Sequence, residues 1–131
     1  MTWGRNPTIN DKGMDGYKKG TLEIAELCKA FERDMGVPVV PCGLIYYDLI
    51  VNPPVLRDAT LRKDWVFMEE NIHQNHVGTM VNVAAHYAVM TGRSPVGLPM
   101  WDPYPAELVR AIQERTWDIV RKWKRGEIDL R

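Results

Sequence analysis

Apolar residues recur at steps of three and four in two parts of the chain, which is the spacing of one helix face. In the first part they predict an amphipathic helix over residues 17–35 that ends at Gly36 and is marked by Ile24, Leu27, Cys28, Phe31 and Met35. In the second part they predict a helix over residues 105–124, with a stripe formed by Leu108, Ile112, Ile119, Val120 and Trp123. Each helix should turn its apolar side to a core and its charged side to water.

The segment 76–91 is apolar on nearly every side, unlike either amphipathic helix. Asn75 can cap a helix at its start and Gly92 can end it, so the pattern predicts a helix that runs to about Thr91. A helix without a polar side is typical of the interior of a larger body. We therefore expect the helix at 76–91 to be buried.

A β-branched run, "VPVVPCGLIYY", follows the first predicted helix after a glycine. The order helix, short turn and buried strand is typical of a βαβ unit, so a parallel strand is predicted at Val37–Leu44. The predicted fold class is α/β, a partial three-layer α/β/α sandwich of the flavodoxin-like type with a short parallel sheet. Because only one full-length strand is visible, its neighbour must be Met1–Trp3 or come from another copy of the chain.

Length and charge narrow the functional classes. With 131 residues, the chain is predicted to be a single domain, 1–131. Seventeen basic and seventeen acidic side chains give a net charge of zero, which removes the positive field expected of a nucleic-acid-binding protein. The chain shows neither a membrane-length apolar run nor a signal peptide, so we expect a soluble, cytoplasmic protein with neither nucleic acid nor membrane as partner. Cys28 and Cys42 are interpreted as buried free thiols.

The stretch "EENIHQNHVGT", residues 69–79, is the richest in chemistry. One helical turn could gather Glu70, His73 and His76 around a metal, but zinc needs three or four ligands with a supporting shell, and His86 has no acidic neighbour within four positions. No metal and no cofactor are therefore predicted. Alternatively, the two glutamates could simply favour the positive end of a helix dipole, ahead of Asn75.

A third interpretation of this stretch is an acid–base pair. The carboxylate of Glu70 could hold one ring nitrogen of His73, leaving the other nitrogen free to accept a hydroxyl proton during acyl transfer. Spacing alone does not separate this interpretation from the other two.

The longer segment "FMEENIHQNHVGTMVNVAAHYAVMTGRSPVGLP" resembles the carboxyl-terminal block of SGNH (GDSL-type) hydrolases, in which a carboxylate and the catalytic histidine stand as D-x-x-H. "VPVVPCGLIYYDLI" looks like that family's last core strand and "AELVRAIQERTWDIV" like its closing helix. The resemblance covers nearly the whole chain but only the second half of a family member. It implies that His73 is the general base and Glu70 the acid, although Glu70 stands where Asp is usual and Gln74 where Pro is frequent.

The family's nucleophile and oxyanion donors have no counterpart in the sequence. The only serine, Ser94, lies in the loop "GRSPVG" and is interpreted as a turn residue. Two functions are therefore expected. The first is a truncated SGNH-type hydrolase for esters or carbohydrate esters, inactive unless an amino-terminal half complements it. The second is a non-catalytic, self-associating interaction module derived from that fold.

Self-association follows from the predicted strand and from the apolar helix at 76–91. A lone strand leaves its hydrogen-bonding edge open, and such an edge recruits another chain. A two-fold dimer is the commonest oligomer. We therefore expect a homodimer that buries Val39, Leu44, Val81 or Met80 near its interface.

Overall fold

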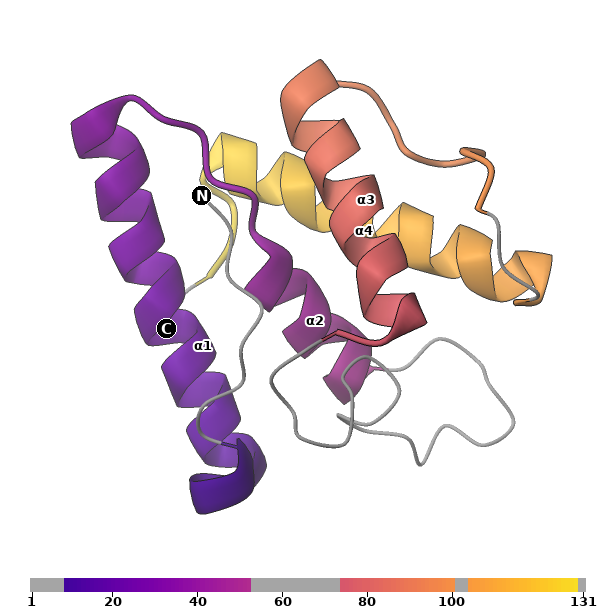
Figure 1. The fold of residues 1–131 in the computed structure, drawn as a ribbon. Coiled ribbons are helices and arrows are strands. Elements are labelled where there is room, and N and C mark those ends of the chain that lie inside the picture. Colours follow the sequence, from indigo (N-terminus) through magenta and orange to yellow (C-terminus); the bar gives the residue numbers. More distant parts are fainter. Residues whose placement is uncertain (1–8, 53–73, 101–103, 130–131) are drawn as a thin grey trace.

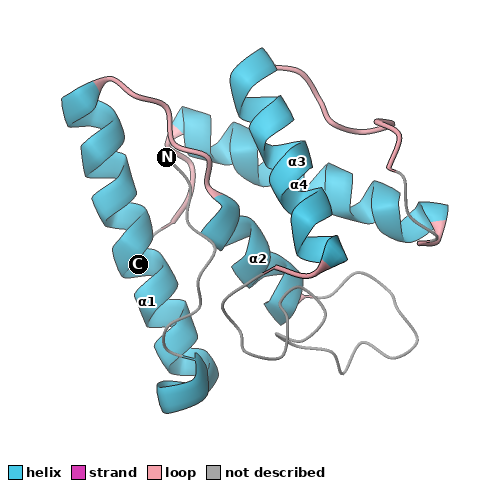
Figure 2. Cartoon of the chain, in the orientation of Figure 1, coloured by secondary structure: helices cyan, strands magenta, loops and turns pink. Residues whose placement is uncertain are grey.

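A computed structural model describes residues 9–52, 74–100 and 104–129, with side chains from Asp15 onward. Its elements are four helices: α1 (Ile9–Met35), α2 (Cys42–Val51), α3 (His76–Thr91) and α4 (Ala106–Arg125). Among the described residues there is no strand, as Figures 1 and 2 show. The prediction of an α/β sandwich with a parallel sheet is therefore wrong, and the described part of the chain is helical.

The error lies in the segment predicted as the strand Val37–Leu44. Residues 37–41 form no strand, with a single isolated bridge residue at Val40, and α2 begins directly afterwards at Cys42. Pro41 occupies the N-cap position, and its carbonyl accepts hydrogen bonds from the backbone N–H groups of Leu44 (3.1 Å) and Ile45 (3.2 Å). A proline lacks only the N–H that the start of a helix would leave unused, so "PCGLIYYDLIV" is compatible with a helix. A short run that is apolar throughout has no period that separates a buried strand from a buried helix.

The other three helices lie where the sequence predicts them, but in α1 Leu27, Phe31 and Met35, which were expected to face a core, are exposed. Helix α3 has the predicted bounds, with Asn75 as N-cap and Gly92 in the left-handed conformation (φ 69°) at its end. Helix α4 covers the range predicted as 105–124 within one residue at each end. Helix α1 ends before Gly36 (φ 66°) as predicted, but it begins at Ile9, eight residues before the expected start.

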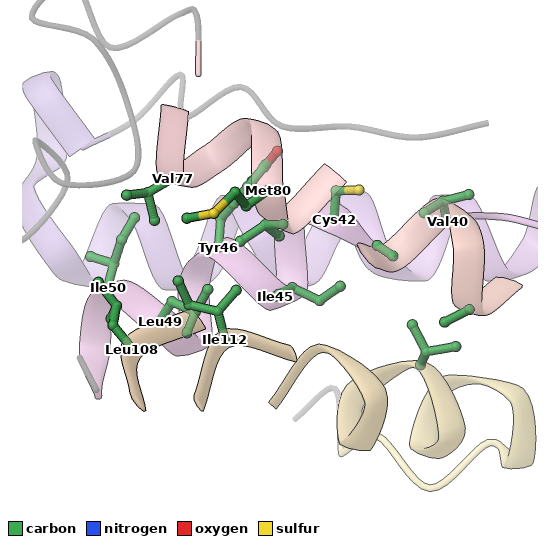
Figure 3. Close-up of a cluster of buried hydrophobic side chains, with 14 of the residues drawn as sticks. Val40, Cys42, Ile45, Tyr46, Leu49, Ile50, Val77, Met80, Leu108 and Ile112 are labelled. Atoms are coloured by element: carbon green, nitrogen blue, oxygen red, sulfur yellow. The ribbon is translucent and has the colours of Figure 1, made fainter. Parts of the chain in front are cut away.

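Helix α2 lies at the centre and packs against each of the other three helices, while α3 also packs on α4 (Figure 1). Side chains from α2, α3 and α4, together with Tyr17 of α1, form the main core, in which Leu108 and Ile112 of α4 point towards Leu49 and Ile50 of α2 (Figure 3). A smaller core joins α1 to the end of α4 and consists of Ala25, Cys28, Val39, Leu44 and Trp123. The carboxyl end of α2 and the amino end of α3 lie at the same end of the molecule (Figure 1).

Helix α3 is only partly buried, contrary to the expectation from its composition. Its inner residues, among them Val81, Ala84 and Ala88, have no exposed surface. On its outer side, however, Val83 is 52% exposed and Met90 is 81% exposed. Helices α2 and α4 pack against one side of α3 and leave its other side exposed.

Candidate functional site

The two residues predicted to do chemistry, Glu70 and His73, lie outside the described residues. What the structure describes is the end of the molecule onto which their segment leads. The first described residue after His73 is Gln74, and the first turn of α3 follows at once. The described residues closest to His73 in the sequence are therefore Gln74, Asn75 and the first turn of α3.

Asn75 fixes the start of α3 two residues after His73. Its side-chain oxygen accepts a hydrogen bond from the backbone N–H of Gly78 (3.1 Å). Its carbonyl accepts from the backbone N–H (2.9 Å) and the hydroxyl (3.0 Å) of Thr79. This is a complete side-chain cap, which typically stabilises a helix by about 1 kcal/mol. The cap thereby stabilises the start of α3 two residues after His73.

Tyr46 of α2 ties this end of α3 to the core. Its buried hydroxyl donates to the side-chain oxygen of Asn82 (2.5 Å) and lies 3.3 Å from the carbonyl of Gly78. Burial, with contributions from neighbouring Cys42 and Tyr17, raises the pKa of Tyr46 far above its ordinary value. The phenol therefore stays protonated and acts as a positioning hydrogen-bond donor rather than as an acid or base.

The remaining histidines do not form a metal site with described Cys, Asp or Glu side chains. His76 is the exposed first residue of α3. The Nδ1 atom of half-buried His86 lies 2.8 Å from the carbonyl of Asn82, and because a carbonyl only accepts, this nitrogen carries the proton. Among residues 15–52, 74–100 and 104–129, no three His, Cys, Asp or Glu side chains gather as metal ligands would.

Ser94 and the two cysteines have structural roles. The hydroxyl oxygen of Ser94 accepts a hydrogen bond from the backbone N–H of Val96 (3.2 Å), which is the turn role expected from the sequence. Cys28 and Cys42 are both buried free thiols, as predicted. Burial raises the pKa of the Cys28 thiol, which keeps it protonated and unreactive.

Two polar junctions were not predicted, because each joins residues far apart in the sequence. In the first, the Lys29 ammonium donates to Glu32 (2.9 Å) and to the carbonyl of Trp123 (2.7 Å), and lies 4.0 Å from the centre of the Trp123 ring. Glu32 also accepts the backbone N–H of Val39 (3.0 Å). Burial alone would raise the pKa of Glu32, but the bonds from Val39, Lys29 and Trp123 outweigh it and hold this pKa below its ordinary value.

The second junction holds the carboxyl end of α2. The guanidinium of Arg115, on α4, donates from Nε to the Asp48 carboxylate (2.8 Å) and from Nη2 to the Asp48 carbonyl (3.0 Å). It also donates to the carbonyl of Asn52. The Asp48 carbonyl also accepts the backbone N–H of Asn52 (2.8 Å), so Arg115 adds a charged donor at the end of α2, where the helix dipole favours a cation. Asp48 and Arg115 are 67 positions apart, so no local sequence pattern predicts that they pair.

A surface hollow of about 320 Å³ lies between the loop 96–100 and the first turns of α4. The Gln113 amide beneath it accepts from the backbone N–H of Gly97 and donates to the carbonyl of Leu98, both at 2.9 Å. That amide is thus used in holding the loop. The other described lining residues are Val96, Met100, Tyr104, Ala106, Val109 and Arg110, so the walls are mainly apolar.

Two helices expose apolar side chains in a regular pattern. The α1 stripe consists of Leu27 (71% exposed), Phe31 (37%) and Met35 (61%), one turn apart from each other. The α3 face consists of Val83 and Met90, with half-buried His86 and Tyr87 between them. By contrast, the residues predicted for a dimer interface, Val39, Leu44, Val81 and Met80, are buried inside the chain itself.

Searches of protein-family models, of curated proteins and of solved structures find no match for this chain. The resemblance to SGNH hydrolases thus stays a prediction from the quoted motifs, and the helical fold does not supply the α/β sandwich that it implied. Among the described residues, no helix is both long enough and apolar enough to cross a membrane.

Proposed function

We propose that this chain is a non-catalytic interaction module that associates with a second copy of itself. The observation that carries the proposal is the composition of α3. None of its 16 residues is Asp, Glu, Lys or Arg, although Val83 and Met90 face water. The exposed side of a helix is normally its charged side, so an uncharged and partly apolar outer side is typical of a surface that becomes covered.

The energetic gain from covering this face is moderate. Full burial of an exposed Val or Met side chain contributes about 1.5–3 kcal/mol. A two-fold dimer would cover both side chains in both copies, and part of that gain is spent on the lost freedom of association. We therefore expect a reversible, concentration-dependent dimer rather than an obligate one.

Sedimentation velocity from low to high micromolar concentration tests the proposal. We expect the apparent mass to rise from monomer towards dimer, and Met90→Lys to keep the chain monomeric throughout. Met35→Lys on α1 is the matched control, because it places the same charge on the other exposed stripe and should leave association unchanged. A chain that stays monomeric over the whole range would refute the proposal.

A second candidate function concerns Glu70 and His73, as the acid–base half of an ester-hydrolysing site. It is favoured by the cap at Asn75, which fixes the backbone two residues after His73, and by the resemblance of the surrounding motif. The described residues contain no activated nucleophile, so the serine and the oxyanion donors would come from a complementing amino-terminal half. In this scheme Glu70 orients the imidazole and stabilises the imidazolium that forms when His73 takes the serine proton.

The acid–base candidate can be tested on the chain alone. The protein has three histidines, so proton NMR resolves each imidazole, and single His→Gln variants assign them. If Glu70 holds His73, Glu70→Gln should lower the pKa of His73 because a neighbouring anion favours the imidazolium. Glu69→Gln is the matched control and should change it less. Equal effects of the two substitutions, or none, would remove the pair.

A further inference from the structure

Two histidines of α3 each stand four residues before a methionine, in the pairs His76–Met80 and His86–Met90. Residues four apart are neighbours on the surface of a helix, about 6 Å from each other along its axis. An imidazole nitrogen and a thioether sulfur at this spacing can therefore reach one metal ion from a single side of the helix. Whether a pair does so depends on which of its atoms an ion can approach.

The structure separates the two pairs by exposure. Met80 is 6% exposed and lies among the side chains of the main core (Figure 3), so its sulfur is closed to an ion beside the exposed His76. Met90 is 81% exposed, the highest value among the large apolar side chains of the described residues. Its partner His86 is half-buried on the same side of the helix. Of the two pairs, only His86–Met90 can offer both donor atoms to an ion from solution.

The tautomer of His86 also suits metal binding. Its Nδ1 atom lies 2.8 Å from the carbonyl of Asn82 and carries the proton, so the lone pair of the neutral ring is on Nε2. Histidines that bind metals commonly donate their second ring N–H to a backbone carbonyl or carboxylate, which fixes the orientation of the ring. Long side chains on a helix lean towards its amino end, so we expect Met90 to lean towards His86.

We propose that Nε2 of His86 and Sδ of Met90 bind a copper(I) ion. Thioether sulfur is a soft ligand that selects copper(I), and imidazole also binds copper. Copper(I) accepts as few as two ligands, whereas zinc needs three or four, and the described residues hold no group of three His, Cys, Asp or Glu side chains. The proposal goes beyond the self-association proposed above and does not depend on it, because both donor atoms come from one chain.

The charges around the pair favour an ion of low charge. Helix α3 itself contains no Asp, Glu, Lys or Arg, so both ligands are neutral and the helix supplies no carboxylate to compensate a divalent ion. The pair lies in the last two turns of α3, where the negative end of the helix dipole favours a cation. Two cations oppose it, because the Lys124 ammonium lies 3.4 Å from the carbonyl of Val89 and exposed Arg93 follows the helix. A monovalent ion is therefore favoured over zinc or copper(II).

NMR of protein with ¹³C-methyl methionine tests which atoms bind. Copper(I), kept reduced with ascorbate under nitrogen, is diamagnetic and can be added up to one equivalent. It should shift the ring protons of His86 together with the methyl group of Met90. The signals of His76 and Met35 should stay unchanged. Met35 is the matched control, because it is 61% exposed but has Phe31, not a histidine, four residues before it.

Competition with a chromophoric copper(I) chelator measures the affinity at low micromolar protein concentration, where self-association is weakest. Met90→Leu removes the sulfur while keeping an apolar side chain at this exposed position, so the fold should be retained. It should weaken copper(I) binding at least about tenfold, since even outer-shell partners of a metal site typically contribute about 10–100-fold to affinity. Met35→Leu should leave the affinity unchanged.

The outcomes separate the copper site from the proposed function. Joint shifts of His86 and Met90 that disappear in Met90→Leu support the site. Equal affinities of the unsubstituted chain and Met90→Leu, or a shift of one ligand without the other, would overturn it. Capture of copper by the buried thiols of Cys28 and Cys42, seen as a loss of the folded-state signals without a prior shift at His86 and Met90, would overturn it as well. Self-association is measured separately by sedimentation without copper, so it stands or falls on its own.

Discussion

Helices α2 and α3 are the two most apolar helices of the protein, yet they end in different surroundings. Helix α2 is short and central, and seven of its ten residues are buried. Helix α3 is longer and lies outside it, with Val83 and Met90 in water. Two helices of similar apolar composition thus differ in burial: α2 is mostly buried, whereas α3 has one exposed side. Position in the packing, rather than composition, decides how much of an apolar helix is covered.

The largest expected difference between the two helices is in the cost of removing an apolar side chain. Leu49 of α2 has no exposed surface, so Leu49→Ala should lower the free energy of unfolding by about 2–5 kcal/mol through lost burial and a residual cavity. Val83→Ala on α3 should change it by less than about 0.5 kcal/mol. Urea unfolding of dilute, monomeric protein followed by circular dichroism measures both. Similar losses of unfolding free energy in the two variants would show that Val83 is as buried as Leu49.

The contrast also explains which parts of the fold could be predicted from the sequence. Helices α1, α3 and α4 carry either a periodic stripe or end signals such as Asn75 and Gly92, and these are local. Helix α2 has neither, because Pro41 gives no side-chain cap and the residues of the helix are apolar on nearly every side. Its helical state depends on the three helices that enclose it. A pattern confined to eleven residues could not distinguish it from a strand.

The same reasoning applies to the candidate site. The cap at Asn75 and the turn at Ser94 are local and were predicted. The contact of Tyr46 with Asn82 joins residues 36 positions apart, and no spacing within the quoted stretch points to it. The exposure of Val83 and Met90 could not be predicted either, since it depends on what α2 and α4 leave uncovered.

The next largest effect should come from the carboxyl end of α2, where Arg115 of α4 donates to Asp48 and Asn52. Arg115→Gln removes the charged donor to Asp48 and should cost about 1.5–3 kcal/mol, the range for hydrogen bonds to charged groups. Arg110→Gln is the matched control on the same helix, because its pair with Glu114 is exposed and is worth about 0.3–0.5 kcal/mol. Chemical denaturation of the two variants compares them. Equal losses would mean that Arg115 contributes no more than an ordinary surface pair.

Helix α3 should depend instead on its own cap. Asn75→Ala removes the acceptor for the backbone N–H of Gly78 and should destabilise the protein by about 1 kcal/mol. Asn75→Ser retains a capping oxygen and should recover most of the loss. Hydrogen exchange of the amides in the first turn of α3 should speed up in Asn75→Ala before that of α2. If α2 exchanged first, the start of α3 would not be held by its cap.

The smallest expected effect concerns the start of α2, which Glu32 of α1 holds through the backbone N–H of Val39. The folded-state pKa of Glu32 lies below its ordinary value of 4.5, so the folded chain binds this proton less readily than the unfolded chain does. The contribution of Glu32 is therefore complete above pH 4.5 and is lost as the pH falls through the folded-state pKa. Glu32→Gln keeps an oxygen acceptor but removes the charge. It should therefore lower the free energy of unfolding at neutral pH and make that free energy fall less steeply as the pH decreases. Urea unfolding between pH 3 and pH 7, with Glu26→Gln as the exposed control on the same helix, measures this. If the unsubstituted chain and Glu32→Gln lost stability in parallel as the pH falls, the carboxylate would not hold the start of α2. Helix α3 is capped by the neutral amide of Asn75, so its first turn should persist over the whole range from pH 3 to pH 7.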